Sequence, residues 1–318
     1  MSRSYSKILV TGGAGFIGSH IVDRLLSDSF EVMVIDNLCT GRLENIAHCQ
    51  NREGFHFIEG DIRNFELVKR VIKDVDVVFH EAALVSVTRS VENPALTNEV
   101  NVTGTLTLLK ACLDSSVRRF IHASSSSVYG ETETLPKHEG LTPQPISPYA
   151  VSKMAAESYV KVFHKVYGLE TVCLRYFNVY GARQTYGPYS GVITIFMNRL
   201  LSDQPPIIYG DGEQTRDFTN VQDVVNANML ALTNKSAVGE VFNIATGVAT
   251  TINQLAKMLQ EITGKTDLKP VYTNPRPGDI RHSFADVSKA KKILEYHPKV
   301  SLGEGLAHLV KWYTKRSP

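Results

Sequence analysis

Cysteine is scarce in this sequence and is never closely paired. The 318 residues contain Cys39, Cys49, Cys112 and Cys173, and no two of them have CxxC spacing. This dispersal argues against a disulfide framework and a zinc site, and it favours reduced thiols in a cytoplasmic protein. The histidines show no ligand spacing either. We therefore predict that the protein holds no metal.

Long apolar runs and excess charge are also missing. No run approaches the roughly 18–20 apolar residues of a membrane span, and no charged-then-apolar leader precedes the first apolar segment. The formal net charge of +2 gives no case for nucleic acid as a partner. We expect a cytoplasmic protein with no membrane and no nucleic-acid partner.

Near its start the chain has a short apolar run followed by closely spaced glycines. Lys7–Thr11 is typical of a strand buried on both faces, and an amphipathic helical pattern follows as far as about Leu26. The glycines between them fit both G-x-G-x-x-G and G-x-x-G-x-x-G. Such a turn lets the backbone approach a pyrophosphate at the N-terminus of the helix. The residues predicted to bind there are Gly12, Gly15, Phe16, Ile17 and Gly18.

The next predicted strand, Glu31–Asp36, ends in an acidic residue. A carboxylate at this place suits the hydroxyls of the adenosine ribose and repels a 2′-phosphate. Because no arginine directly follows Asp36, we predict NAD rather than NADP as the cofactor. The alternative for Asp36 is a helix cap at the end of the strand.

Four further apolar runs continue the alternation of strands and helices. They are Phe55–Glu59, Asp76–His80, Arg119–Ala123 and Glu170–Leu174. This alternation predicts an α/β fold with a parallel, doubly wound sheet. Asp61, which precedes Ile62, suits either the adenine edge or a turn. Ala82 and Ala83 leave room for a flat ligand, and Asn101 is expected to be a buried amide that ties strands together.

The segment Ser147–Lys153 predicts the start of a helix that carries a tyrosine and a lysine on one face. Ser147 is a good N-cap and Pro148 suits the first helical position. Tyr149 and Lys153 are four residues apart, which makes them neighbours on a helix. A lysine charge favours the phenolate, so we expect the pKa of Tyr149 to fall below about 10. Such a tyrosine can take a proton from a sugar hydroxyl, although a chance pair on a surface helix is the alternative.

A run of four serines, Ser124–Ser127, follows the fifth predicted strand. Hydroxyl groups at the carboxyl end of a central strand point into the crevice where a parallel sheet binds its ligand. The alternative is a serine-rich loop without a function.

Motifs along nearly the whole chain match one known family. The matching segments are Thr11–Gly18, Asp36–Asn37, Asp61–Ile62, Ser124–Gly130, Tyr149 with Lys153, Arg175–Asn178, Arg216–Phe218 and Arg276–Asp279. Together they resemble the extended short-chain dehydrogenase/reductases, in particular the NAD-dependent nucleotide-sugar epimerase group. The resemblance implies a Rossmann-type NAD-binding domain at 1–176, with a return helix near 220–233. It also implies a smaller C-terminal α/β domain at 177–318 for the nucleotide sugar.

The resemblance also implies roles for single residues. The catalytic residues would be Tyr149, Lys153 and Ser125. The cofactor would be held by the glycine turn and by Asp36, Asn37, Asp61, Ile62, Ala82, Ala83, Ser124, Tyr149, Lys153 and Tyr176. The substrate would be held by Ser125, Ser126, Tyr149, Asn178, Val192, Arg216, Arg276, Asp279 and Ser283. Two of these, Arg216 and Arg276, would clamp the diphosphate, because an arginine fork binds phosphate oxygens in pairs.

The serine run discriminates within this group. Sugar 4,6-dehydratases carry Thr-Asp-Glu at the place of Ser125–Ser127, so a dehydratase would lack its acid and base here, whereas a 4-epimerase would lack nothing. The resemblance places Ser283 beside the hexose 2-position, where a small residue would leave space for an N-acetyl group; the alternative is a residue that only leads into the next helix. We therefore predict 4-epimerisation of UDP-GlcNAc/UDP-GalNAc, and of UDP-Glc/UDP-Gal as well. By family analogy the protein would be a homodimer.

Two alternatives stay open at this point. One is a UDP-uronate epimerase or decarboxylase, for which Arg89 or Arg281 would contact the sugar carboxylate. The other is an NAD-sensing protein without turnover, which would have no need for Tyr149, Lys153 and Ser125 together.

Overall fold

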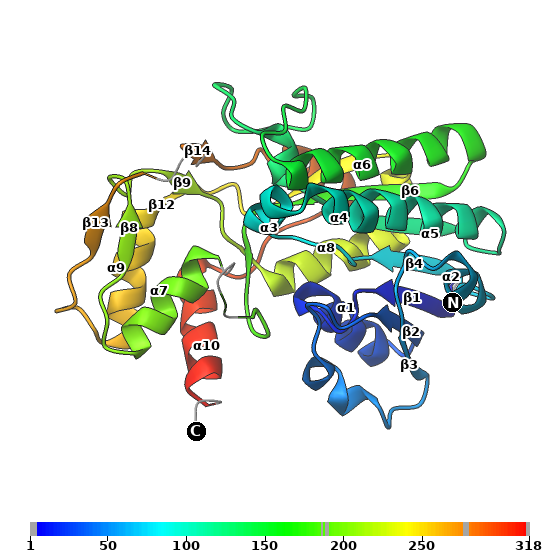
Figure 1. Ribbon diagram of the computed structural model, residues 1–318, viewed down its shortest axis with the longest axis horizontal. Coiled ribbons are helices and arrows are strands. Elements are labelled where there is room, and N and C mark those ends of the chain that lie inside the picture. Colours follow the sequence, from blue (N-terminus) through cyan, green and yellow to red (C-terminus); the bar gives the residue numbers. More distant parts are fainter. Residues whose placement is uncertain (1–4, 186, 188–190, 276–279, 316–318) are drawn as a thin grey trace.

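Seven parallel strands form the central sheet of the computed structural model, which describes residues 5–185, 187, 191–275 and 280–315 (Figure 1). The strands are β1 (Lys7–Thr11), β2 (Glu31–Asp36), β3 (Phe55–Glu59), β4 (Val77–His80), β5 (Arg119–Ser125), β6 (Glu170–Tyr176) and β11 (Val241–Ile244). Their order is β11-β6-β5-β4-β1-β2-β3. The chain therefore runs outward in both directions from β1 and β4. Ligands of doubly wound sheets bind at the carboxyl ends of the strands at such a reversal.

Helices cover both faces of this sheet. One face carries α1 (Phe16–Ser27) and α8 (Val221–Thr233), and the other carries α2 (Phe65–Val71), α5 (Gly104–Leu113) and α6 (Pro148–Tyr167) (Figure 1). Alternate residues of a strand point to opposite faces. Accordingly, Ile8 and Val10 of β1 pack into the core under α1 and α8, whereas Leu9 packs into the opposite core. Both faces are buried, which explains the continuous apolar runs.

A second, smaller lobe has its own apolar core. Its helices are α7 (Val192–Leu201), α9 (Ile252–Thr263) and α10 (Leu302–Thr314). Two small sheets accompany them, β8 (Ile207–Tyr209) with β13 (Val271–Thr273), and β9 (Thr215–Arg216) with β12 (Thr250–Thr251) and β14 (His282–Ser283). The elements of the small sheets come from distant parts of the sequence, so this lobe is assembled by long-range pairing.

Short elements complete the connections. They are α3 (Val87–Glu92), α4 (Pro94–Asn98), β7 (Val179–Tyr180), β10 (Thr219–Asn220), the 3₁₀ turns η1 (Leu43–Asn45), η2 (Ala47–Cys49), η4 (Ser126–Tyr129) and η5 (Lys235–Ala237), and the π-helical turns η3 (Glu99–Thr103) and η6 (Ala290–Leu294). Within the described ranges, no helix has the length and apolar character needed to cross a membrane.

The chain crosses between the two lobes more often than the sequence indicated. The six predicted strands form with small differences at their ends, and α8 packs on α1. The sequence analysis did not predict β11, which pairs with β6 and extends the sheet. Leu294 and Tyr296 also reach the core under α1 and α8. The sheet is thus completed by segments that lie far beyond residue 176.

Candidate active site

The glycine turn lies between β1 and α1 and packs closely on the segment after β4. Gly12 has a φ of +68°, and a Cβ atom there would lie 2.7 Å from the backbone nitrogen of Ala82. A Cβ on Gly18 would lie 2.2 Å from the carbonyl oxygen of Gly12. Gly15 is the N-cap of α1 and provides no side-chain cap. The helix begins at Phe16, followed by Ile17. Its first backbone N–H groups therefore have no side-chain acceptor, and they suit an anion.

Asp36 lies at the end of β2 and is 7% exposed. Its Oδ2 accepts a hydrogen bond from the backbone N–H of Ala14 (3.0 Å), and its Oδ1 accepts one from Leu38 (2.8 Å). Burial raises the pKa of this carboxyl group. A carboxylate has about four lone-pair sites, so Asp36 fixes the glycine turn and still has capacity for ribose hydroxyls. The turn, the uncapped helix and this acid together fit a dinucleotide such as NAD.

Asp61 makes its contacts within its own neighbourhood. Its carboxylate accepts hydrogen bonds from the Arg63 side chain (2.8 and 3.0 Å), and Asn37 donates a further one at 3.0 Å. The hydrogen bonds from Arg63 lower the pKa of Asp61 to about 2. Ile62 is buried beneath this loop. The turn role that the sequence allowed for Asp61 therefore has direct support in these contacts.

Tyr149, Lys153 and Ser125 meet at the carboxyl end of β5. Helix α6 begins as predicted, with Ser147 Oγ accepting from the N–H of Ala150 (3.1 Å). Tyr149 is 9% exposed and forms a hydrogen bond with Ser125, while Lys153 Nζ donates to the carbonyl oxygen of Ala123 (2.8 Å). Ser125 Oγ accepts from the N–H of Ser127 (3.1 Å). A hydroxyl group has one proton, which therefore remains free for Tyr149 or for a ligand.

The pKa of Tyr149 differs from the expectation. Burial raises it above its usual value, and the hydrogen bond with Ser125 lowers it only in part. The amino group of Lys153 is directed to the carbonyl oxygen of Ala123 and not to the Tyr149 hydroxyl. Burial also lowers the pKa of Lys153 to about 8, which weakens it as a cation. The i,i+4 spacing thus predicted the shared helix face correctly, but it did not predict the degree of burial.

A buried ion pair between Glu157 and Arg175 contacts the serine run, and the sequence analysis did not predict it. Ser124 Oγ donates to Glu157 Oε2 (2.6 Å), which also accepts from Arg175 Nε (2.9 Å). A second bond joins Arg175 to Glu157 Oε1 at 2.6 Å. The Arg175 guanidinium lies 4.7 Å from the centre of the Tyr129 ring, and the Tyr129 hydroxyl donates to Asn243 of β11. The order of residues along the chain gives no sign of these contacts.

Asn101 is buried as predicted, but its partners differ from the expectation. Its amide contacts both backbone groups of Leu84 and donates to Ser152 Oγ (2.9 Å). It therefore ties the loop after β4, which contains Ala82 and Ala83, to α6.

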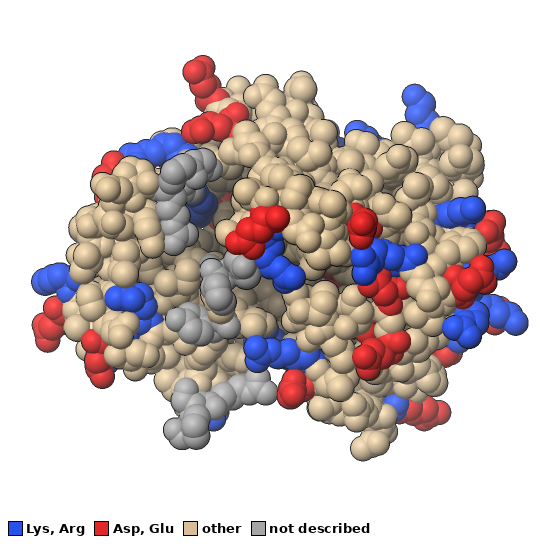
Figure 2. Space-filling view, in the orientation of Figure 1, with Lys and Arg blue, Asp and Glu red and all other residues tan. Residues whose placement is uncertain are grey.

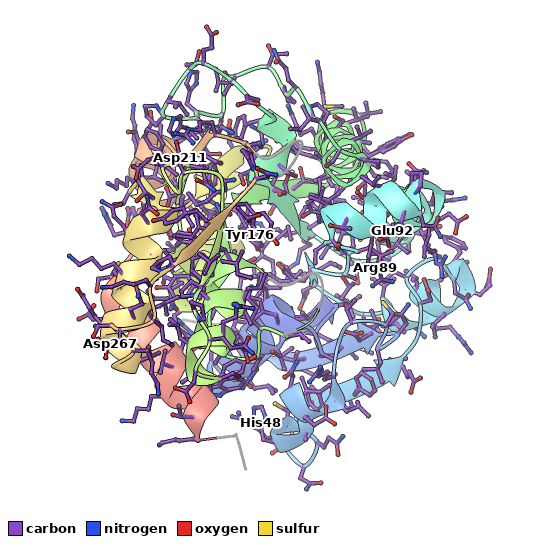
Figure 3. The ribbon with its side chains drawn as sticks, turned by 60° about the vertical axis from the view of Figure 1, so that its left-hand side comes forward. His48, Arg89, Glu92, Tyr176, Asp211 and Asp267 are labelled. Carbon is purple, nitrogen blue, oxygen red and sulfur yellow. The ribbon has the colours of Figure 1, made fainter. Side chains whose placement is uncertain are left out.

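Glu81 is a second residue that the sequence analysis missed. It follows β4, and its Oε1 accepts a hydrogen bond from the hydroxyl of Tyr176 (2.9 Å). Tyr176 accepts in turn from Asn228 Nδ2 of α8 (2.8 Å). Figure 3 shows Tyr176 near the middle of the molecule, between the sheet and the second lobe. A signal was present in the sequence, since Glu81 interrupts an otherwise uncharged run at the end of a buried strand.

The residues predicted to hold the substrate come from the second lobe and its connections. Ser283 of β14 is 6% exposed and pairs in register with Arg216 of β9. The Arg216 side chain donates to the carbonyl oxygen of Thr215 (2.8 Å). Asn178 is exposed just after β6, and Val192 begins α7. Ser126 lies in η4, directly after Ser125. Arg276 and Asp279 lie outside the described residues.

Two further arginines were considered for a sugar carboxylate. Arg281 forms two hydrogen bonds with Asp211, at 2.7 and 2.9 Å, on an exposed part of the second lobe. Arg89 lies on the short helix α3 (Figure 3). On the face shown in Figure 2, basic and acidic side chains are interspersed over both lobes.

Three potential metal ligands lie together within the described part of the chain. His48 Nε2 is 2.6 Å from Asp23 Oδ1, and Cys49 Sγ is 3.4 Å from His48 Nε2. The other oxygen of Asp23 accepts from Arg183 (2.6 Å). A cation bound here would lie beside a guanidinium group, and Asp23 is already satisfied by these contacts. The group therefore gives no evidence for a metal.

Comparison with known proteins identifies the family. The family model described as GDP-mannose 4,6 dehydratase matches residues 9–309. A UDP-glucose 4-epimerase from Thermotoga maritima, solved with UDP-glucose, is 46% identical, with a TM-score of 0.92 and coverage of 97% of this chain and 99% of that chain. A UDP-N-acetylglucosamine 4-epimerase from Methanobrevibacter ruminantium, solved with UDP-N-acetylmuramic acid, is 40% identical, with a TM-score of 0.94 and coverage of 99% and 100%.

A third structure contains the cofactor. The UDP-glucuronic acid 4-epimerase from Bacillus cereus, solved with UDP-glucuronic acid and NAD, is 37% identical, with a TM-score of 0.91 and coverage of 97% of this chain and 99% of that chain. Its NAD agrees with the glycine turn, the uncapped α1 and Asp36 of this chain. The chain belongs to the GDP-mannose 4,6-dehydratase family, the NAD-dependent extended short-chain dehydrogenase/reductases that include UDP-sugar 4-epimerases.

Proposed function

We propose that this protein is a UDP-sugar 4-epimerase that interconverts UDP-GlcNAc with UDP-GalNAc, and UDP-Glc with UDP-Gal. The observation that carries the proposal is the meeting of Tyr149, Lys153 and Ser125 at the end of β5. The neighbouring Ser126 and Ser127 provide no carboxylate, and a dehydration needs an acid and a base to expel water. The related 4-epimerases support the same reaction.

The chain's own residues move the proton and hold the reactants. Tyr149 takes the proton of the sugar 4-hydroxyl, and Ser125, hydrogen-bonded to Tyr149, orients that hydroxyl or relays its proton. When bound, NAD accepts hydride from C4 and later returns it to the opposite face. The 4-keto sugar turns over in the pocket between these two transfers. Lys153, whose amino group lies at the carboxyl end of β5, holds the ribose next to the nicotinamide.

In this proposal the two lobes bind different ligands. Residues 1–176, with α8 and β11, hold NAD and contribute Ser125, Ser126 and Tyr149 to the sugar, and the remaining residues hold the rest of the UDP-sugar. In this proposal Arg216 and Arg276 bind the diphosphate, Asn178, Val192 and Asp279 contact the nucleotide part, and Ser126 lies beside the sugar. Ser283, buried next to Arg216, leaves space for a 2-acetamido group.

The uronate alternative receives less support. A sugar carboxylate needs a free cationic group. Of the two arginines considered, Arg281 is already engaged by both oxygens of Asp211, which leaves Arg89 of α3 as the remaining candidate. We therefore favour neutral sugars as substrates, although one related structure is a UDP-glucuronic acid 4-epimerase.

Exposed apolar side chains on α6 support a homodimer. Tyr159, Val162, Val166 and Tyr167 are between 41% and 64% exposed. A surface helix with this many exposed apolar residues is typical of an interface between subunits. The four free cysteines support the cytoplasmic location.

Proton NMR of the nucleotide sugar tests the proposal. Purified protein is incubated with UDP-GlcNAc and no added NAD, and conversion to UDP-GalNAc is the expected result. Conversion of UDP-Glc alone would support 4-epimerisation, but it would exclude the proposal that Ser283 leaves space for the 2-acetamido group. No conversion of either sugar would contradict the proposal. The variant Tyr149→Phe is the control, and it should keep less than a few per cent of the activity.

A further inference from the structure

Glu81 lies where the dinucleotide of a doubly wound sheet is bound. It follows β4, at the point where the order of strands reverses. Its backbone N–H donates to the carbonyl oxygen of Thr11 at the end of β1 (3.2 Å). A Cβ on Gly12 would lie 3.0 Å from the carbonyl carbon of Glu81. The backbone of Glu81 is therefore held directly against the glycine turn.

The carboxylate of Glu81 is only partly satisfied. Oε1 accepts from the Tyr176 hydroxyl at 2.9 Å, and Oε2 accepts no hydrogen bond from the residues that the structure describes. The charged group that acts on it is Lys153, from α6. The other group in contact is neutral, since Tyr176 is a phenol whose pKa burial raises. His80, the preceding residue, hydrogen-bonds to Thr11 and Thr105, and burial lowers its pKa to about 3.

We propose that Glu81 is an electrostatic residue of the cofactor site, whose carboxylate favours the oxidised, positively charged nicotinamide of NAD over the neutral reduced ring. This inference rests on the proposed function, because it assumes that hydride moves between the sugar and the nicotinamide beside Lys153 and Tyr149. A negative charge near the ring favours return of the hydride to the 4-keto sugar. The reduced cofactor and the free keto sugar then do not accumulate.

The protonation behaviour of Glu81 makes the proposal testable by pH. Burial raises its pKa to about 7, whereas Lys153 lowers it in part. Below this pH Glu81 is neutral and the protein should behave like a variant without the charge. Above it the carboxylate is ionised, and the preference for oxidised NAD should increase. Lys153, with a pKa of about 8, also titrates in this range, and the charge of Glu81 raises that pKa. Removing the Glu81 carboxylate therefore also shifts Lys153, whereas Glu81→Asp keeps a negative charge near Lys153 and is the control for this coupling.

A partition measurement tests the charge without any sugar. The protein is equilibrated with mixtures of NAD and NADH, rapidly separated from free cofactor, and the bound forms are quantified after denaturation. At pH 8.5, Glu81→Gln should raise the bound NADH/NAD ratio about tenfold over wild type. For a two-electron couple this corresponds to a change of ~30 mV in the reduction potential of the bound cofactor. At pH 6 the two proteins should differ little. Glu81→Asp, which keeps the charge, should stay close to wild type, and so should Glu133→Gln, which removes an exposed carboxylate.

The variant Tyr176→Phe separates charge from positioning. It removes the hydrogen bond to Glu81 and leaves the carboxylate in place. If Glu81 only positions the Tyr176 ring, Tyr176→Phe would change the partition as much as Glu81→Gln, and this result would overturn the proposal. An unchanged partition in Glu81→Gln at pH 8.5 would overturn it as well. Because no sugar is present in the partition measurement, its outcome does not depend on whether the protein epimerises UDP-sugars. Failure of the proposed function and failure of this inference can therefore be told apart.

Discussion

The buried pair of Glu157 and Arg175 allows the most quantitative prediction. The two side chains are 6% and 4% exposed, and two hydrogen bonds join them. Glu157→Gln removes the negative charge and leaves Arg175 buried without a counter-ion. Breaking a buried pair by removing one partner costs about 3–5 kcal/mol. Because the amide oxygen of Gln still accepts one hydrogen bond, we expect a loss of about 3 kcal/mol in the free energy of unfolding.

Urea unfolding followed by circular dichroism measures this loss. The control is Glu261→Gln, which makes the same change in the exposed pair of Lys257 and Glu261 on α9 and should cost less than about 1 kcal/mol. In the double variant Glu157→Gln/Arg175→Met no charge remains buried, so its cost should be smaller than the sum of the two single costs. Equal losses for Glu157→Gln and Glu261→Gln would refute the reasoning. Activity should also fall, because Glu157 accepts from Ser124, next to Ser125.

Three further outcomes follow from the site. Ser125→Ala should lower kcat for epimerisation about 10²-fold or more with bound NAD unchanged; a smaller effect would remove Ser125 from the proton path. Ser283→Tyr should suppress turnover of UDP-GlcNAc before that of UDP-Glc, whereas Ser283→Ala should affect neither; equal suppression of both sugars would contradict the role of Ser283. The Gly12→Ala protein should lose its NAD on purification, because the added Cβ meets Ala82. The control is Gly264→Ala, which has a similar φ of +69° but lies in open space, and this protein should retain NAD. Equal retention of NAD by the two variants would show that the close approach at Gly12 is unimportant.

Local patterns in the sequence predicted the parts of the fold that local physics determines. The apolar runs gave β1 to β6, and the Ser147–Pro148 signal gave the start of α6. The i,i+4 rule placed Tyr149 and Lys153 on one face. Contacts between distant segments were not predictable in this way, since β11 joins β6 across a long stretch of chain. The same applies to the Glu157–Arg175 pair and to the contact of Glu81 with Tyr176.

The expected pKa of Tyr149 shows a second limit of sequence reasoning. Helical spacing indicates which side chains are neighbours, but it does not give their burial or the direction of a flexible amine. Here burial outweighs the hydrogen bond with Ser125, and Lys153 points to a carbonyl oxygen. The sign of the shift is therefore set by the tertiary structure.

The place of β11 in the sheet has a consequence for synthesis of the chain. On the ribosome, β6 is complete at Tyr176, but its outer edge has no partner until Val241–Ile244 has emerged. An unpaired strand edge is a template for aggregation, and domains fold from the N-terminus as the chain grows. A fragment that stops at residue 176 would keep this edge open permanently. The nascent protein thus passes through a stage in which one edge of its central sheet is unpaired and open to aggregation.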